Sequence, residues 1–440
     1  MILRTYQKPH AEKLLAILMD KRTALDSSDC GCGKTFSGAW IARELGVETL
    51  VVCPLSVVPV WERVLAEAGV TAEVWNYESA WRKLGTVKPY GSGSFFQFTK
   101  AWPFVIFDEV HRCAGETTMQ SKLLIAAKRQ CGRVLGLSAT AFSTLLKCKA
   151  IGFMLNLHAL SDYRLWLFTQ GVKEVEMKLR NGRAFKKLTI GKEADRRAME
   201  ILHERIFGLA GRGSRMRIAD IPDFPKTIIE VRLLAGAPAA VMRLSEEMQA
   251  FYRERNVRAA MTKDEMAQLV FWRQASETAK IPMLLDMAED AIQTSKVCCF
   301  VNFNATMDEL LAGAKAKGWT TGFIRGDDKK DRQQTIADFQ DNKIDFLVAN
   351  IQAGGAGVSL HDEVTQYPRT SLVCPTWSAV DLRQVFGRPH RDSGGLSRQF
   401  MVCWNNGIET RVAKSVERKL SNISTLNDGD LEGAEDLVLA

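Results

Sequence analysis

The stretch DCGCGKT at residues 29–35 decides the fold of this 440-residue chain. It is followed by a helical pattern and precedes an apolar run that begins at Thr49. Gly31 and Gly33 lack side chains, so backbone N–H groups at the start of the next helix are able to surround an anion. Position 28 is serine, where the usual pattern has glycine. The stretch predicts a phosphate loop, residues 28–35, with one departure from the common pattern.

Lys34 and Thr35 give the phosphate loop its chemistry. The Lys34 ammonium neutralises the charge of β- and γ-phosphate groups, and the Thr35 hydroxyl is a ligand for Mg²⁺. Taken alone, a glycine-rich turn with a chance Lys-Thr pair explains the stretch about equally well. We do not expect Cys30 and Cys32 to bind a metal ion, because the sequence has no further ligands at metal-binding spacing around them.

Apolar runs of strand character recur along the chain, separated by stretches of helical length. They are TLVVCP from Thr49, PFVIF from Pro103, RVLGL from Arg133, CCFVNF, FLVAN, SLVC and FMVCW. This alternation predicts an α/β protein whose parallel sheets are covered by helices on both faces. The strands form two groups, so we expect two parallel-sheet lobes. Between them lies a mostly helical, charged insert with the loop-like segments GRGSR and IPDFPK.

The predicted division of the chain follows from these two groups. We expect a first lobe at residues 1–150, a helical and basic insert at 151–290, a second lobe at 291–420 and an acidic tail at 421–440. From Tyr163 to Lys226, fifteen Lys and Arg stand against eight Asp and Glu, a surplus of +7. Such a surplus favours a polyanionic partner, although a solvated helical surface also explains it.

The composition is ordinary for a globular protein, with 46% hydrophobic and 25% charged residues. No window approaches the roughly twenty apolar residues of a membrane span, and the N-terminus lacks an export signal. Ten cysteines stand singly or in apolar runs, without a CxxC pair. We interpret them as reduced core residues and expect a cytoplasmic or nucleoid-associated protein.

The run VIFDEVH at residues 105–111 delivers two carboxylates at the end of an apolar strand. In an open α/β sheet, such a strand end faces the phosphate loop. Asp108 is then placed to hold Mg²⁺, largely through water, and Glu109 to polarise the water that attacks a γ-phosphate. Taken singly, Asp-Glu after a strand is usually an ordinary exposed loop. Its position downstream of a phosphate loop favours ATP hydrolysis.

In the phosphate loop and the Asp108-Glu109 pair, the sequence resembles the superfamily 2 helicases, and further motifs follow in that family's order. LRTYQ, which ends at Gln7, looks like the Q motif, in which Gln7 would pair with adenine. CPLSVVPVW, around Ser56, resembles motif Ia, which contacts nucleic acid. SAT, from Ser138 to Thr140, matches motif III, which would couple the nucleotide site to the nucleic acid.

Two motifs extend the resemblance into the second half. QVFGRPHR begins at Gln384 and fits motif VI, in which Arg388 and Arg391 would reach the γ-phosphate across the cleft between the lobes. AGGAGVSL begins at Ala353 and resembles motif V. The resemblance to motif V implies that Gly354 and Gly355 contact nucleic acid and that Gly357 contacts ATP.

The resemblance also implies two RecA-like lobes, with ATP and Mg²⁺ as cofactors. Catalysis is then expected from the charged residues Lys34, Glu109, Arg388 and Arg391. Motif Ia and the 156 residues between Thr140 and Val297 resemble the Swi/Snf-type, chromatin-remodeller-like branch, nearest to its fork-remodelling annealing helicases. This branch implies a DNA translocase that remodels or unwinds duplex or branched DNA in replication or repair. An RNA helicase, or a nucleotide-gated clamp with little turnover, stays open as an alternative.

No base-reading motif accompanies these residues, so we expect contacts to the nucleic-acid backbone without sequence specificity. The basic cluster GRGSRMR supplies the candidate phosphate contacts Arg212, Arg215 and Arg217. We expect a monomeric motor whose partner is DNA, with RNA or single-stranded DNA as the alternative.

Overall fold

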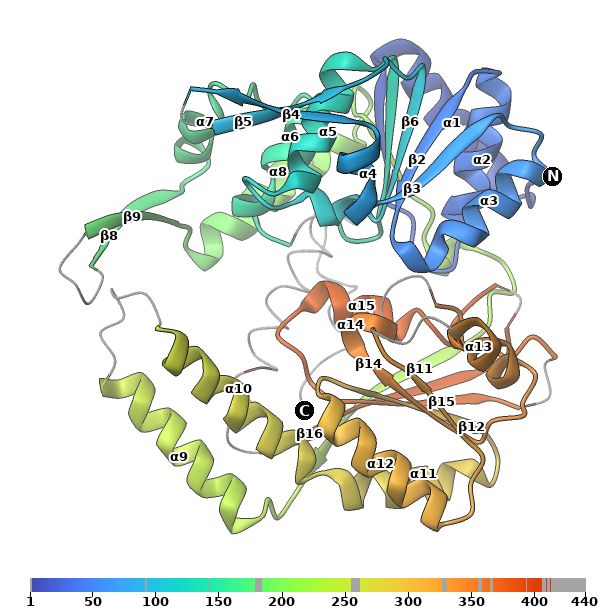
Figure 1. Cartoon of the computed structure of the whole chain (residues 1–440), viewed down its shortest axis with the longest axis vertical. Helices are drawn as coiled ribbons and strands as arrows, with labels where there is room; N and C mark the ends of the chain where they lie inside the picture. Colours follow the sequence, from blue (N-terminus) through green and yellow to red (C-terminus); the bar gives the residue numbers. More distant parts are fainter. Residues whose placement is uncertain are drawn as a thin grey trace. The chain divides into compact units, whose positions relative to one another are not determined.

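The computed structural model forms two compact units, each built around its own parallel sheet (Figure 1). It describes residues 2–91, 93–141, 143–178, 184–254, 262–326, 331–354, 358–364, 367–392, 394–405, 409 and 412. The first unit comprises residues 1–173 and 190–223, and the second comprises residues 174–189 and 224–421. The predicted acidic tail at 421–440 lies outside the described residues.

The first unit contains a six-stranded sheet in which neighbouring strands run parallel. The strand order is β10-β1-β7-β6-β2-β3. Its strands are β1 Thr23–Asp26, β2 Thr49–Cys53, β3 Ala72–Asn76, β6 Phe104–Asp108, β7 Arg133–Leu137 and β10 Gly213–Ser214. Strands β1, β2 and β6 are buried along their whole length, as a parallel sheet with helices on both faces requires.

Helices cover both faces of this sheet. Three of them, which share one apolar core with β1, β2, β6 and β7, are α1 Gln7–Lys21, α2 Lys34–Leu45 and α3 Val58–Glu67. The other face carries α4 Tyr77–Lys83 and α5 Met119–Gln130 (Figure 1). The remaining elements are α6 Lys149–Met154, α7 Tyr163–Thr169, α8 Lys192–Phe207, the hairpin β4 Gly85–Tyr90 with β5 Gly93–Phe98, and the short helices η1 Leu55–Val57, η2 Val110–Cys113, η3 Leu145–Lys147 and η4 Ile218–Asp220.

The second unit repeats this architecture with a second parallel sheet, of order β11-β16-β15-β12-β14-β13. Its strands are β11 Thr227–Leu234, β12 Lys296–Val301, β13 Thr321–Ile324, β14 Phe346–Asn350, β15 Arg369–Val373 and β16 Ser397–Trp404. Helices α11 Ile281–Ile292 and α12 Asn304–Ala316 bury their apolar faces on it. The other elements are α13 Arg332–Gln340, α14 Ile351–Gly354, α15 Ala379–Phe386, the helices α9 Ala239–Glu254 and α10 Lys263–Thr278, and the hairpin β8 Lys173–Lys178 with β9 Ala184–Thr189.

The predicted fold class is confirmed, because the chain forms two parallel α/β lobes and every apolar run forms a strand. Residues 151–290, expected as a helical and basic insert, divide between the two units. Helices α6 to α8 and strand β10 belong to the first unit, whereas β11 and α9 to α11 belong to the second. The expected GRGSR loop contains β10, which joins the first sheet. A strand of two residues is too short for apolar periodicity to reveal it.

The cysteines agree with the expectation of core residues. All ten are free and nine are buried. Burial raises the pKa of buried thiols, to about 12 for Cys32 and Cys148, which makes those two unreactive. Within the described ranges, no helix is long and apolar enough to cross a membrane, and no His, Cys, Asp and Glu side chains gather as a metal site.

Candidate active site

The carboxyl ends of four neighbouring strands bring the predicted motifs of the first unit to one sheet edge. Because β1, β7, β6 and β2 run parallel, the residues that follow them emerge on the same side. The phosphate loop follows β1, Ser138 follows β7 and the segment with Ser56 follows β2. Asp108 is the last residue of β6. Motifs I, Ia, II and III therefore lie together.

The phosphate loop turns on two glycines and runs into helix α2. Gly31 and Gly33 have φ angles of 98° and 81°, in the left-handed region that disfavours side chains. A Cβ atom at Gly33 would lie 2.2 Å from Nε2 of Gln7, so the site has no room for one. Helix α2 starts at Lys34, and its first N–H groups lack intrahelical partners. The loop thus has the backbone geometry of an anion site.

The Lys34 ammonium lies inside the phosphate loop. Its Nζ donates hydrogen bonds to the carbonyl oxygens of Ser28 (2.8 Å) and Asp29 (3.0 Å). Burial disfavours the charged form, but the neighbouring Cys30 and Glu109 outweigh it and hold the pKa of Lys34 above its usual value. The loop therefore carries a permanent positive charge next to its backbone N–H groups.

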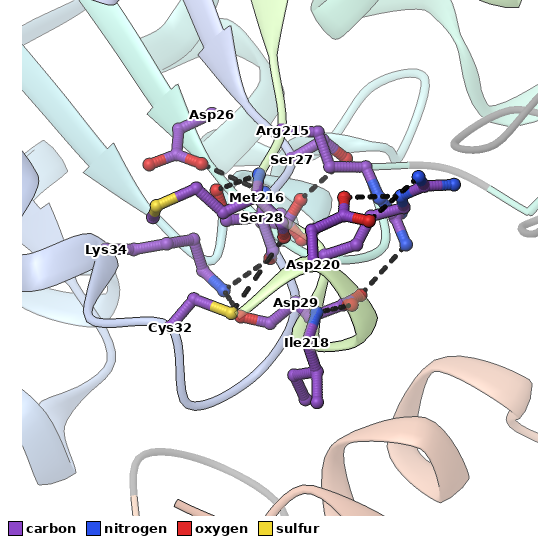
Figure 2. Close-up of polar contacts among 12 residues, drawn as sticks. Asp26, Ser27, Ser28, Asp29, Cys32, Lys34, Arg215, Met216, Ile218 and Asp220 are labelled. Atoms are coloured by element: carbon purple, nitrogen blue, oxygen red, sulfur yellow. Dashed lines mark hydrogen bonds and ion pairs between the residues drawn. The ribbon is translucent and has the colours of Figure 1, made fainter. Parts of the chain in front are cut away.

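Ser28, the departure from the usual pattern, belongs to a buried polar cluster beneath the loop. Its hydroxyl accepts a hydrogen bond from the Met216 N–H at 3.0 Å (Figure 2) and lies 3.2 Å from Nε2 of His10. His10 lies 3.1 Å from the carboxylate of Asp26. Burial opposes ionisation of Asp26, yet His10 keeps its pKa below the usual value. Glycine at position 28 would lose both contacts of the hydroxyl, so the serine side chain holds the loop to α1 and to the segment that contains Met216.

A second connection joins the loop to residues 214–218, which begin in β10 (Figure 2). Oδ1 of Asp29 pairs with Nη2 of Arg215 at 3.0 Å, and Oδ2 accepts the Ile218 N–H at 3.0 Å. The Asp29 N–H donates to the Met216 carbonyl at 3.0 Å. The side chains of Arg215 and Asp29 are only 9% and 15% exposed. This loop clamp, formed by Asp29, Arg215 and Ile218, fixes the backbone immediately before Gly31.

Asp108 and Glu109 differ in their surroundings although they are adjacent. Asp108 is buried, and burial followed by the charge of Glu109 raises its pKa to about 6. Its Oδ2 accepts the Trp61 indole N–H at 2.8 Å, and its Oδ1 accepts the Glu109 N–H at 3.0 Å. Glu109 has φ 53° and ψ 52°, a left-handed conformation that is rare for residues other than glycine. Strained backbone of this kind concentrates at functional sites.

A chain of polar contacts leads from Glu109 to motif III through His111. Nδ1 of His111 lies 3.2 Å from Oε2 of Glu109 and 3.0 Å from the Ser138 hydroxyl. The same hydroxyl accepts the Thr140 N–H at 3.1 Å. The sequence motifs give no role to His111, although only Val110 separates it from Glu109. The imidazole is the physical connection between motifs II and III.

Gln7 lies at the start of α1, beside the phosphate loop. Its Oε1 accepts the Arg4 N–H at 3.0 Å, and its Nε2 donates to the Cys32 carbonyl at 3.0 Å. An amide side chain has two donor hydrogens and two acceptor lone pairs, so one of each remains. One donor and one acceptor are what the N7 and N6 edge of adenine requires. The pairing of Gln7 with adenine stays a prediction.

Two arginines of motif VI lie in the second unit, next to the last residues of motif V. Nη1 of Arg388 donates to the Val358 carbonyl at 3.1 Å, and Nε of Arg391 donates to the Ser359 hydroxyl at 3.3 Å. Burial, followed by the charge of Arg391, lowers the pKa of His361 to about 4. The two guanidinium groups therefore lie beside Val358 and Ser359 of motif V.

The other motif V and VI residues are described only in part. Gln384 lies on α15 and is buried. Gly354 ends α14. The predicted contacts Gly355 and Gly357 lie outside the described residues.

The predicted nucleic-acid contacts have different surroundings. Ser56 lies in η1 and is half-buried. Arg212 donates to the Lys21 carbonyl at 2.6 Å and to the Thr23 hydroxyl at 2.9 Å, near the amino end of β1 and away from the phosphate loop. Arg215 belongs to the loop clamp. The Arg217 side chain pairs with Asp220 and is 50% exposed. Among the three arginines, Arg217 is the most accessible to a partner.

Comparison with known proteins identifies the family. Residues 279–393 match the model described as "Helicase conserved C-terminal domain". The chain is also similar to the putative ATP-dependent RNA helicase L364 of Acanthamoeba polyphaga mimivirus, with 31% identity over 467 residues, covering 97% of this chain and 84% of that protein. The chain belongs to the superfamily 2 helicases. This helicase family is ATP-dependent, which accounts for the phosphate loop at the sheet edge.

Two solved structures are similar over nearly the full length of the helicase. The SWI2/SNF2 ATPase core of Sulfolobus solfataricus in complex with dsDNA has 16% identity and a TM-score of 0.39, covering 99% of this chain and 95% of that chain. Dbp5 of S. cerevisiae, bound to RNA and ADP BeF3, has 10% identity and a TM-score of 0.49, covering 98% and 93%.

The first unit of the helicase fits ATP and Mg²⁺, the cofactors that the family implies. The absent Cβ of Gly33 leaves the loop backbone open, and the Lys34 ammonium matches the charge of phosphates. The hydroxyl of Thr35 and the carboxylate of Asp108 are oxygen ligands, which Mg²⁺ prefers. Thr35 and Asp108 would hold the metal ion, and Lys34 would hold the phosphates.

Replacement of Glu109 by Gln should slow hydrolysis by roughly 100- to 10,000-fold while ATP binding persists. The amide keeps the shape of the side chain but does not accept the proton of the attacking water. Phosphate release and fluorescent-nucleotide binding measure the two effects. Glu78→Gln, at an exposed glutamate of the same unit, is the control. Parental turnover in Glu109→Gln would move the catalytic base to another residue.

Replacement of Arg215 by Ala should raise the KM for ATP and lower the free energy of unfolding by about 3 kcal/mol, because it leaves the Asp29 carboxylate without its charged partner. The matched control is Arg196→Ala, which breaks an exposed pair with Glu200 and should cost about 0.5 kcal/mol or less. ATP-dependent kinetics and denaturant unfolding measure both quantities. Equal behaviour of the two variants would show that the loop clamp does not position the loop.

Proposed function

We propose that this helicase is a DNA translocase that uses ATP hydrolysis to move along duplex or branched DNA and to remodel or unwind it. The catalytic part of the proposal is supported by a complete set of charged groups: Lys34, Glu109, Arg388 and Arg391. A nucleotide-gated clamp with little turnover would be expected to lack one of them. The single observation that carries turnover is the contact chain from Glu109 through His111 to Ser138, because a clamp has no need of an oriented base.

Each residue of the first unit has a defined task in this proposal. Glu109 accepts a proton from the attacking water, and its contact with His111 holds the carboxylate in place. Lys34 neutralises the phosphate oxygens on which negative charge gathers. Bound Mg²⁺ supplies further positive charge and orients the phosphates. Gln7 selects adenine through its remaining donor and acceptor.

Arg388 and Arg391 are proposed to add positive charge to the γ-phosphate from the second unit. Such arginines act on the charge that develops in the transition state, so they affect the rate more than ATP binding. Hydrolysis would then depend on both units, which ties it to movement between them.

The choice of DNA rests on the resemblance of motif Ia and of the long segment between motifs III and IV to the Swi/Snf-type branch. Part of that segment forms α9 and α10, which lie outside the six-stranded sheet of the second unit (Figure 1). Ser56 and Arg217 are the proposed phosphate contacts, because Ser56 follows β2 at the motif edge and Arg217 is half exposed. Contacts of this kind hold the backbone without reading bases.

An RNA helicase is the second candidate function. It is favoured by one observation, the name of the mimivirus relative, which calls that protein a putative ATP-dependent RNA helicase. Both candidates use the same nucleotide site, so the catalytic residues do not distinguish them. The preferred nucleic acid does.

ATP turnover should be stimulated more strongly by duplex or forked DNA than by RNA. The measurement compares single-stranded, duplex and forked DNA with single-stranded and duplex RNA of matched length and sequence. All assays use one salt concentration, because contacts to phosphates weaken steeply as salt rises. Stimulation by RNA alone would replace the DNA proposal with the RNA helicase. Stimulation by single-stranded DNA alone would point to a strand-tracking helicase.

A further inference from the structure

Trp61 connects motif Ia to the carboxylate of motif II. It lies on α3, which begins at Val58 directly after η1, the short helix that contains Ser56. Its side chain is fully buried, and its indole N–H donates to Oδ2 of Asp108 at 2.8 Å. A buried tryptophan N–H requires a partner, but here the partner is the predicted magnesium ligand.

The indole ring of Trp61 is also held by the helix that follows the phosphate loop. A Cβ atom at Gly38 of α2 would lie 3.0 Å from Cη2 of Trp61, so the missing side chain at Gly38 makes room for the ring. The tryptophan therefore touches the helix of motif I and the carboxylate of motif II, while its own helix continues from motif Ia. Its position depends on all three segments.

The other contacts of Asp108 show what the Trp61 hydrogen bond adds. Oδ1 of Asp108 accepts the Glu109 N–H at 3.0 Å, and the Asp108 carbonyl accepts the Tyr77 hydroxyl at 2.8 Å. The Glu109 contact comes from the next residue of the chain, and the Tyr77 contact comes from α4 but reaches only the backbone carbonyl. The Trp61 contact is the one that comes to Oδ2 from a separate helix, and it fixes the rotation of the carboxylate plane. Each carboxylate oxygen keeps a further lone pair for a metal or its water.

We propose that Trp61 is a positioning residue that orients the Asp108 carboxylate for Mg²⁺ and passes displacements of the motif Ia helix to that carboxylate. The inference rests on the proposed function, in which Asp108 holds the metal ion. Hydrogen-bond partners of metal-binding carboxylates orient the ligand, and their loss weakens metal binding. The partner here is rigid, because a buried indole has few alternative positions.

Trp102 supplies a matched control in the same unit. It is buried like Trp61, and it lies two residues before the start of β6, the strand that ends at Asp108. Its indole N–H has no hydrogen-bond partner within the part of the chain that the structure describes. Trp102→Phe therefore removes a similar volume from the core without removing a hydrogen bond. Trp61→Phe removes both.

The experiment measures Mg²⁺-dependent binding of a fluorescent ATP analogue to the full chain, as Mg²⁺ is titrated at a fixed nucleotide concentration. Trp61→Phe should need roughly 10- to 100-fold more Mg²⁺ than the parent for half-maximal binding. Trp102→Phe should match the parent. Binding of the analogue in EDTA should be equal in all three proteins, because the hydrogen bond acts on the metal ligand. Thermal unfolding records the loss of core packing separately.

Equal Mg²⁺ requirements in Trp61→Phe and Trp102→Phe would overturn the inference. Asp108→Ala separates this failure from failure of the proposed function. Loss of Mg²⁺-dependent binding in Asp108→Ala with a parental Trp61→Phe overturns only the role of Trp61. Parental behaviour of Asp108→Ala overturns the metal assignment of the proposed function, and the Trp61 inference falls with it.

A second measurement applies where Trp61→Phe does not fold. Indole ¹⁵N–¹H spectra of the parent and of Asp108→Ala should differ in one resonance that loses its hydrogen bond. In the parent, the same resonance should move when Mg²⁺ is added with ADP, but not with ADP in EDTA. Spectra in which no indole resonance responds to Mg²⁺ would overturn the inference.

Discussion

The common direction of the strands in the first sheet is the constraint on which the site depends. Strands β1, β7, β6 and β2 run parallel, so the segments that follow them emerge at one edge. Buried strands satisfy their backbone groups by pairing with each other, so the edge is held by the whole sheet. The sheet therefore fixes the positions of the phosphate loop, Asp108 and Ser138. Catalysis needs such fixed positions, because charged groups stabilise a transition state best when they are already in place.

Local signals explain why much of this arrangement could be predicted from the sequence. The apolar runs form strands because a parallel strand buried on both faces must be apolar along most of its length. Gly33 and Lys34 are recognisable because a loop that binds phosphate needs a bare backbone and a cation within a few residues. Asp108 and Glu109 are recognisable because they stand at the end of an apolar run that is typical of a strand.

Contacts between distant segments could not be predicted in this way. The ion pair of Asp29 and Arg215 joins residues 186 positions apart, and neither residue has a local pattern that identifies its partner. A basic cluster suggests nucleic-acid contacts, yet the structure places Arg215 in the frame of the phosphate loop. Trp61 and Asp108 are 47 positions apart, and a tryptophan that only packs has the same sequence signal as one that orients a carboxylate.

We propose that the sheet edge of the first unit binds and hydrolyses ATP. ATP turnover by full-length Lys34→Ala in the presence of nucleic acid tests it most directly, because Lys34 is the ammonium that lies inside the phosphate loop. Lys100→Ala, at an exposed lysine of the same unit, is the control. The account predicts turnover at background level in Lys34→Ala, with parental turnover in Lys100→Ala and parental unfolding in both. Near-parental turnover in a folded Lys34→Ala protein would contradict it.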